Sequence, residues 1–159
     1  MQIKIIAVGK LKEKYWQQAV AEYCKRLSPY AKIQITEVAE ERCSDNPGKA
    51  EIQRVIDKEG ERILKELRPG DYVLPLAIEG KQYSSPELAV NIEKLAVEGR
   101  ARLAFIIGGS FGLADKVLEQ GDLHLSFSAL TFPHQMMRVI LLEQLYRVFS
   151  IINGGKYHK

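Results

Sequence analysis

Apolar runs typical of strands alternate along this chain with longer segments of helical spacing. The runs expected to form strands are residues 2–8, 32–38, 72–78, 102–107 and 122–127. Helical spacing marks residues 11–27, 49–67, 85–99, 113–120 and 133–150. This alternation predicts an α/β fold with a mainly parallel sheet flanked by helices, and it leaves the strand order open. We expect right-handed, unknotted connections and a single domain over residues 1–159.

The composition favours a globular protein of the cytoplasm. Hydrophobic residues make up 46% and charged residues 27% of the chain. No apolar run reaches the roughly 18 residues that a membrane span requires, and the N-terminus lacks the pattern of a signal peptide. Cys24 and Cys43 have no spacing typical of metal ligands. We therefore expect reduced thiols, no metal and no membrane contact.

Positive charge is concentrated at the two ends of the chain. The net charge is only +3, but residues 1–32 hold seven Lys or Arg against two Glu, and residues 133–159 hold four against one. A surface built from both ends could face the phosphates of a nucleic acid. The alternative is a set of lysines scattered over a solvated surface.

Three expected strands end in segments suited to holding a small ligand. Residues 102–107 are followed by the glycine-rich residues 108–112, and residues 122–127 by the uncharged residues 128–132. Pro75 cannot donate to a sheet ladder, so we expect the third strand to lose a neighbour and end at residues 75–77. Ligands of open parallel sheets bind at the carboxyl ends of the strands, which places the site here. Neither a dinucleotide fingerprint nor a P-loop is present, so a cofactor without a pyrophosphate fits better.

The same glycine-rich segment matches the G-x-S-x-G pattern of a hydrolase nucleophile, with Ser110 at its centre. Asp115 or Asp122, followed by a histidine, would complete a triad in the appropriate chain order; the three histidines are His124, His134 and His158. Against this hypothesis, the chain is short for such a hydrolase and has no separate oxyanion-loop motif. The glycines could also simply make a tight turn between a strand and a helix.

The last expected helix is apolar on almost every side, which indicates burial on more than one face. A subunit interface, most simply a twofold homodimer, would explain this pattern, and burial in the core is the alternative. His134 and Arg138 are four residues apart and so share a face near the start of this helix. In the basic tail that follows, Tyr157 and His158 could contact a nucleobase, or the tail could be frayed.

Several of these segments together resemble the RlmH family of small bacterial SPOUT-class methyltransferases. The resemblance spans the whole chain. It is carried by residues 4–10, 106–109 with Gly112, 125–134 with Arg138, 143–147, and 157–158. It implies a SPOUT-like sheet with a C-terminal trefoil knot, which contradicts our expectation of unknotted connections. It also implies an obligate homodimer.

The resemblance further implies that the cofactor is S-adenosylmethionine and that the substrate is 23S rRNA within the ribosome. The expected reaction is methylation of N3 of a pseudouridine in a stem-loop of the assembled ribosome. Cofactor binding is expected, by position, at Leu76, Gly108, Phe127, Ser128, Ala129, Leu130, Thr131 and Phe132.

Transfer to N3 requires that this nitrogen lose its proton. His134, Tyr157 and His158 are the candidate bases, and Arg138 is a candidate clamp on phosphate or on developing charge. In a dimer, the tail of one subunit could complete the site of the other. Because the chain has little net charge, we expect an isolated RNA hairpin to be bound poorly and the assembled ribosome to supply further contacts.

Overall fold

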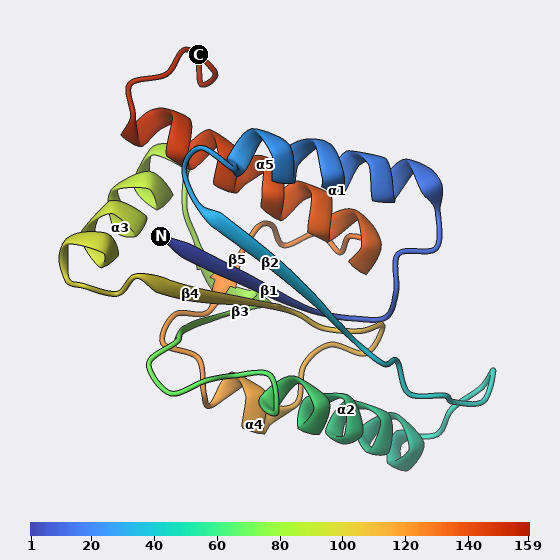
Figure 1. The fold of residues 1–159 in the computed structure, drawn as a ribbon. Helices are drawn as coiled ribbons and strands as arrows, with labels where there is room; N and C mark the ends of the chain where they lie inside the picture. Colours follow the sequence, from blue (N-terminus) through green and yellow to red (C-terminus); the bar gives the residue numbers. More distant parts are fainter.

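The computed structural model describes residues 1–159 and contains a five-stranded sheet in the order β2-β1-β4-β3-β5 (Figure 1). Every paired neighbour in it runs parallel, as the alternating sequence pattern predicts. The strands are β1 (Gln2–Val8), β2 (Lys32–Val38), β3 (Tyr72–Gln82), β4 (Arg102–Ile107) and β5 (Leu125–Ser126). The helices are α1 (Lys14–Leu27), α2 (Lys49–Leu64), α3 (Ser85–Val97), α4 (Asp115–Leu118) and α5 (His134–Ile152).

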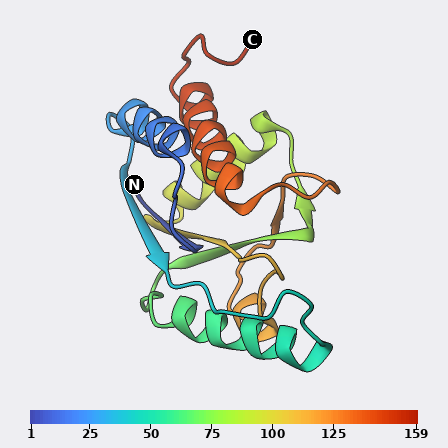
Figure 2. The ribbon, with the colours of Figure 1, turned by 90° about the vertical axis from the view of Figure 1, so that its right-hand side faces the viewer.

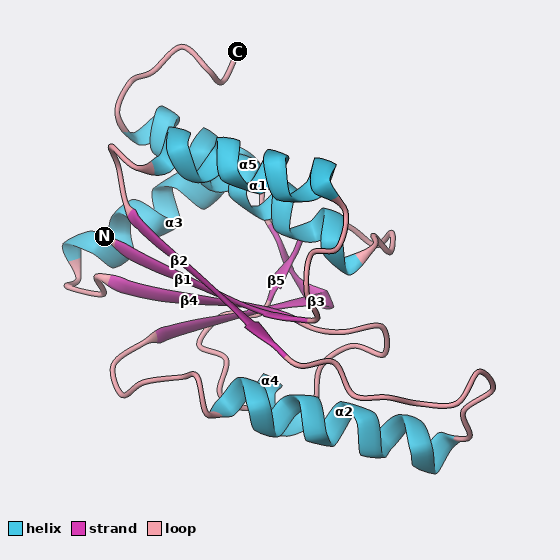
Figure 3. Ribbon diagram, turned by 45° about the vertical axis from the view of Figure 1, so that its right-hand side comes forward, coloured by secondary structure: helices cyan, strands magenta, loops and turns pink.

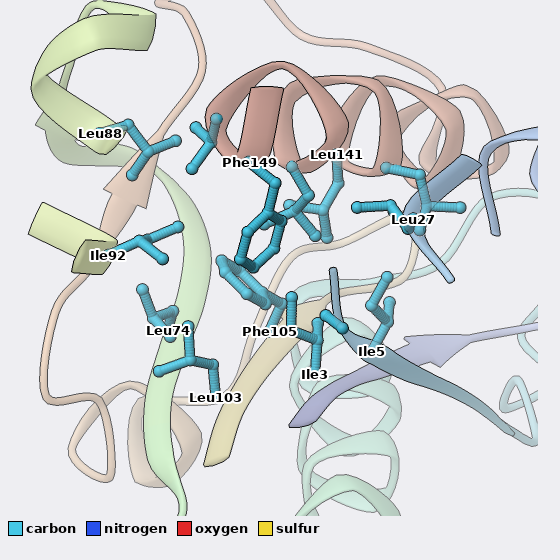
Figure 4. Packing of buried hydrophobic residues seen from close by; sticks show 14 of the residues in the cluster. Ile3, Ile5, Leu27, Leu74, Leu88, Ile92, Leu103, Phe105, Leu141 and Phe149 are labelled. Carbon is cyan, nitrogen blue, oxygen red and sulfur yellow. The ribbon is translucent and has the colours of Figure 1, made fainter. Parts of the chain in front are cut away.

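Helices cover both faces of the sheet, with α1, α3 and α5 on one side and α2 and α4 on the other (Figures 1 and 3). Alternate residues of β1 accordingly enter two separate cores. Ile3 and Ile5 pack in a cluster of 20 buried residues that includes parts of α3 and α5 (Figure 4). Ile6 and Val8 pack in a second cluster, of eight, with α2 and α4. Burial on both faces explains why the central strands β1 and β4 are nearly continuous apolar runs.

The third strand does lose a neighbour at Pro75, but it does not end there. β3 pairs with β4 from Tyr72 to Pro75, and from Leu76 onward its partner is β5. The prediction that residues 75–77 form the strand's carboxyl end is therefore wrong. The imide nitrogen prevents further pairing on one side only, and the chain remains extended along a different neighbour as far as Gln82.

Several ends of elements differ from the sequence prediction. The first helix begins at Lys14 rather than at residue 11, and the second ends at Leu64 rather than at residue 67. Strand β5 is only two residues long, and α4 only four. Ser84 caps α3: it accepts the Glu87 N–H, while the Glu87 carboxylate accepts the Ser84 N–H. This capping box fixes the start of α3 at Ser85, where the helical spacing predicts it.

The last helix, α5, packs on both α1 and α3, and the chain beyond it extends away from the sheet (Figure 1). One side of α5 is core: Leu141, Leu142 and Leu145 are fully buried. Other apolar side chains of α5, Ile140 and Ile151 among them, stay only half-buried. Core burial thus accounts for part of the apolar pattern and leaves a second apolar surface along the helix. None of the helices combines the length and apolar character that crossing a bilayer requires.

Candidate active site

A cavity of about 560 Å³ opens beside the middle of β3, where β4 and β5 change into loops. Its walls come from the middle of β3, the loop after β4, the loop after β5 and the start of α5. Of the eight residues predicted to bind cofactor, all except Ala129 line it. The cavity residues from these segments are Leu76–Glu79, Ile107–Leu113, Leu118, Leu125–Ser128, Leu130–Phe132, His134 and Met137.

The loop after β4 can adopt its shape only with glycine at two positions. A Cβ on Gly108 would lie 2.8 Å from the carbonyl oxygen of Gly112, which is closer than real Cβ atoms come. Gly112 has φ of +89°, a left-handed conformation that L side chains rarely adopt. Its N–H donates to the carbonyl of Gly109 at 3.1 Å, which closes the turn. The loop therefore presents bare backbone to the cavity.

The loop after β5 is held by its own serines. The Ser126 hydroxyl donates to the Ser128 carbonyl at 3.3 Å, and the Ser128 hydroxyl accepts the Leu130 N–H at 3.0 Å. No side chain of residues 125–132 is charged. Glu79 and His134 are the only titratable residues among those that line the cavity. A ligand here would meet mainly apolar side chains and backbone amides, which suits an adenosine-like group better than a polyphosphate.

Arg138 is not on the surface of this cavity. Arg138 was expected to share a face with His134 and was a candidate clamp on phosphate or on developing charge, but the structure buries its side chain, which is 0% exposed. Its guanidinium donates to Glu37 at 2.6 Å and to the carbonyls of Val8 and Gly9 at 2.9 and 2.7 Å. Burial lowers the pKa of Arg138, and Glu37 partly offsets that effect. Arg138 thus ties α5 to the carboxyl ends of β1 and β2 instead of facing solvent.

Tyr157 and His158 lie far from the cavity within one chain. The Tyr157 hydroxyl donates to Glu143 at 3.0 Å, and Arg147 lies 3.4 Å from Nδ1 of His158. At a rise of about 1.5 Å per residue, Glu143 is about 14 Å along α5 from His134, which lines the cavity. The structure brings His134 to the cavity and leaves the two tail residues beside Glu143 and Arg147, in the middle and second half of α5.

The environment of Tyr157 also makes it a poor base. Burial, first, and then its contacts with Tyr23 and the Glu143 carboxylate raise the pKa of Tyr157 to about 12. A phenol with this pKa stays protonated at neutral pH, so it serves as a hydrogen-bond donor. Glu143 additionally holds Arg147 in an ion pair, and Arg147 stacks over the Tyr157 ring. The side chains of Tyr23, Glu143, Arg147 and Tyr157 thus form one linked polar group.

The geometry offers Ser110 no partner for a triad. Ser110 lines the cavity, but none of the hydrogen bonds of the three histidine rings involves it. His124 bonds the Leu118 carbonyl at 2.9 Å, and His158 is held near Arg147. The hydrolase hypothesis therefore lacks its base–nucleophile contact.

Glu59 is a residue of this site that the sequence prediction missed. It belongs to α2 and is 3% exposed, directly behind the glycine loop. A signal was present in the sequence, because residues 55, 59 and 63 share one helix face and the other two members, Val55 and Ile63, are buried. A glutamate on an apolar stripe indicates a specific contact.

Comparison with known proteins decides the family. Residues 1–158 match the family described as "Predicted SPOUT methyltransferase". The chain belongs to the SPOUT methyltransferase family. The family resemblance stated from the sequence is therefore confirmed.

Similar proteins span the whole length of this SPOUT methyltransferase. Ribosomal RNA large subunit methyltransferase H of Bacillus pumilus (strain SAFR-032) is 52% identical over 159 residues, which is 100% of both chains. The protein of the same name from Carboxydothermus hydrogenoformans is 51% identical over 159 residues, again 100% of both chains.

Solved structures agree on the fold. A probable methylase family protein from Haemophilus influenzae Rd KW20 superposes with a TM-score of 0.55 at 17% identity, covering 99% of this chain and 70% of the other. A putative methylase family protein from Neisseria gonorrhoeae gives a TM-score of 0.51 at 12% identity, covering 99% and 85%.

Proposed function

We propose that this SPOUT methyltransferase transfers a methyl group from S-adenosylmethionine to N3 of a pseudouridine in a 23S rRNA stem-loop of the assembled ribosome. The full-length relatives named as ribosomal RNA large subunit methyltransferases support the substrate class. One observation of the structure supports the cofactor most strongly. It is the cavity at the strand ends, whose walls are uncharged loops and exposed glycine backbone.

The residues present fit such a cofactor. The cavity volume of about 560 Å³ lies in the range of small-molecule sites. Gly108 lines the cavity with backbone alone, and the absence of a Cβ there lets the loop fold back closely on Gly112. Leu76, Gly108 and residues 127–132 would hold the group by backbone hydrogen bonds and apolar contact. When bound, S-adenosylmethionine supplies an already activated methyl group.

The protein's own task is then to align the acceptor and to remove its proton. His134 is the imidazole that the chain itself places at the cavity, so we propose it as one candidate acceptor for the N3 proton. Tyr157 would donate a hydrogen bond rather than take a proton. Arg138 would act indirectly, because it holds the carboxyl end of β1 beside the His134 ring. Glu79 also lines the cavity, and the Glu40 carboxylate and the His134 ring both lie close to Gly9.

We propose that the enzyme acts as a homodimer in which the tail of one copy completes the site of the other. Two observations support this. Several apolar side chains of α5, such as Ile140, are only half-buried within one chain, and neither Tyr157 nor His158 lines the cavity of its own chain. We further propose one domain over residues 1–159, a trefoil knot in its C-terminal part and a cytoplasmic location. Neither metal nor membrane enters the proposed reaction.

Mixing two inactive variants tests the shared site. One carries Gly108→Ala, and the other carries both Tyr157→Ala and His158→Ala. If the tail acts on the second copy, co-expression creates heterodimers with one intact site, and about a quarter of the wild-type sites recover for random pairing. Methyl transfer by the co-expressed proteins is the measurement. If the tail acts on its own chain, every site carries a defect and the mixture stays inactive.

Replacing Ser110 with alanine separates the methyltransferase from the hydrolase hypothesis. Ser110 has no histidine partner, so we expect Ser110→Ala to change methyl transfer by less than about threefold. We also expect no labelling of the wild-type protein by a serine-directed phosphonate. Loss of activity together with labelling of wild type at Ser110 would support a hydrolase instead.

A further inference from the structure

Two consecutive residues of α2, Glu59 and Gly60, pack beneath the glycine loop and the residues that follow it. Helix α2 lies with α4 against the face of the sheet opposite α5 (Figure 2). A Cβ on Gly60 would lie 2.8 Å from the Cβ of Ala114, so only glycine lets α2 approach the end of the loop this closely. The preceding residue, Glu59, lies under the start of the loop, because a Cβ on Gly109 would lie 2.6 Å from its Oε2 atom. Residues 59 and 60 therefore pack beneath Gly109, in the cavity wall, and beneath Ala114, just after it.

One oxygen of Glu59 is anchored, and the other faces the loop. Oε1 accepts the backbone N–H of Glu41 at 2.9 Å. That backbone is itself fixed, because the Glu41 carboxylate pairs with Arg54, Lys58 and Arg62. The carboxyl group cannot turn without giving up this hydrogen bond. Glu59 thus connects the segment after β2 with the glycine loop after β4.

Packing alone does not explain a carboxylate at this position. Glu59 is 3% exposed, and burial raises its pKa. The charged groups around it are Glu40, Glu41 and Arg62. Its neighbours on the helix face, Val55 and Ile63, are buried apolar side chains, so a leucine at residue 59 would suit the core better. Burying a carboxylate costs free energy, which the hydrogen bond from the Glu41 N–H offsets only in part.

We propose that Glu59 is a positioning residue for the cofactor: it holds the loop of residues 108–112 in the conformation that binds S-adenosylmethionine. It does so from behind the loop and does not touch the cofactor. The anchored carboxylate lies against Gly109 and so prevents this residue from moving away from the cavity. It thereby fixes the position at which the neighbouring backbone of Gly108 would contact the ligand. This inference rests on the proposed function, because it assumes that the cavity binds that cofactor.

The test compares Glu59→Leu and Glu59→Gln with Glu61→Gln, an exposed control on the same helix. Affinity for S-adenosylmethionine is measured by titration calorimetry, and KM and kcat by methyl transfer to ribosomes. We expect Glu59→Leu to weaken cofactor binding about tenfold while kcat at saturating cofactor changes less than twofold. Glu59→Gln keeps the Oε1 acceptor and should restore most of the affinity. Glu61→Gln should match wild type.

If Glu59→Leu does not fold, the inference is tested by comparing Gly109→Ala with the double variant Gly109→Ala, Glu59→Ala. Gly109→Ala places a methyl group against Glu59 Oε2, and Glu59→Ala in the same chain removes that oxygen. We expect the double variant to bind the cofactor about threefold or more tightly than Gly109→Ala alone. If the two substitutions changed the affinity for S-adenosylmethionine additively, the inference would be overturned. A Glu59→Leu protein that is less stable but binds the cofactor with wild-type affinity would also overturn it. Failure of the wild-type protein itself to bind S-adenosylmethionine would instead contradict the proposed function.

Discussion

Replacing Arg138 with methionine is expected to lower the free energy of unfolding by about 3 kcal/mol. The substitution keeps most of the side-chain volume and removes the charge. It leaves the Glu37 carboxylate and the carbonyls of Val8 and Gly9 without their buried donor. We expect the lower end of the usual range for a broken buried pair, because the Glu37 side chain is 32% exposed and water can reach it.

Chemical denaturation at a fixed protein concentration measures this effect, because the stability of the proposed dimer would depend on concentration. The control is Arg26→Met. Arg26 pairs with Glu22 on the surface of α1, with both side chains more than 40% exposed. A surface pair of this kind contributes less than about 1 kcal/mol. Equal losses for the two variants would contradict a structural role for Arg138 as the tie between α5 and the sheet.

Replacing Gly108 with alanine is expected to weaken binding of S-adenosylmethionine by about 100-fold. The added methyl group would lie 2.8 Å from the Gly112 carbonyl oxygen, and backbone cannot move aside as a flexible side chain can. The loop must therefore shift by a sizeable fraction of an ångström, and misplacements of about 1 Å can cost about 100-fold. Calorimetric titration with the cofactor measures the loss.

Gly48→Ala is the control for this variant. Gly48 precedes α2, and a Cβ there would meet nothing within 4 Å. We expect Gly48→Ala to bind the cofactor as tightly as wild type. A Gly108→Ala protein that binds normally would show that the glycine loop is not the cofactor's contact surface.

The fold could be predicted because the sequence pattern and the structure obey the same constraint. Strands covered on both faces must be apolar throughout, and parallel neighbours must be joined by helices. Residues 2–8 and 102–107 show this, whereas residues 32–38 form an edge strand that alternates apolar and polar side chains and is only partly buried. All three strands have the predicted limits. β3 departs from its prediction because its partner changes at Pro75, and no local pattern encodes which strand lies on the other side.

The position of the site could also be predicted, but not the roles of its charged residues. Strand ends and glycines locate the cavity because parallel strands end at one edge of the sheet. The roles of Arg138 and Glu59 depend on contacts across more than one element. Arg138 meets Glu37 from 101 residues away, and Glu59 meets the loop of Gly109. Helical spacing shows that each residue faces inward or outward and does not identify the group that it meets there.

Transfer of a labelled methyl group from S-adenosylmethionine to 23S rRNA tests the central claim most directly. The acceptors are assembled ribosomes that lack the modification and, in parallel, the naked rRNA. We expect label in the 23S rRNA of ribosomes, at N3 of a pseudouridine, and scarcely any in naked rRNA. Efficient labelling of the naked RNA would contradict the need for an assembled target. No label in either acceptor, together with no binding of the cofactor, would contradict the proposed function itself.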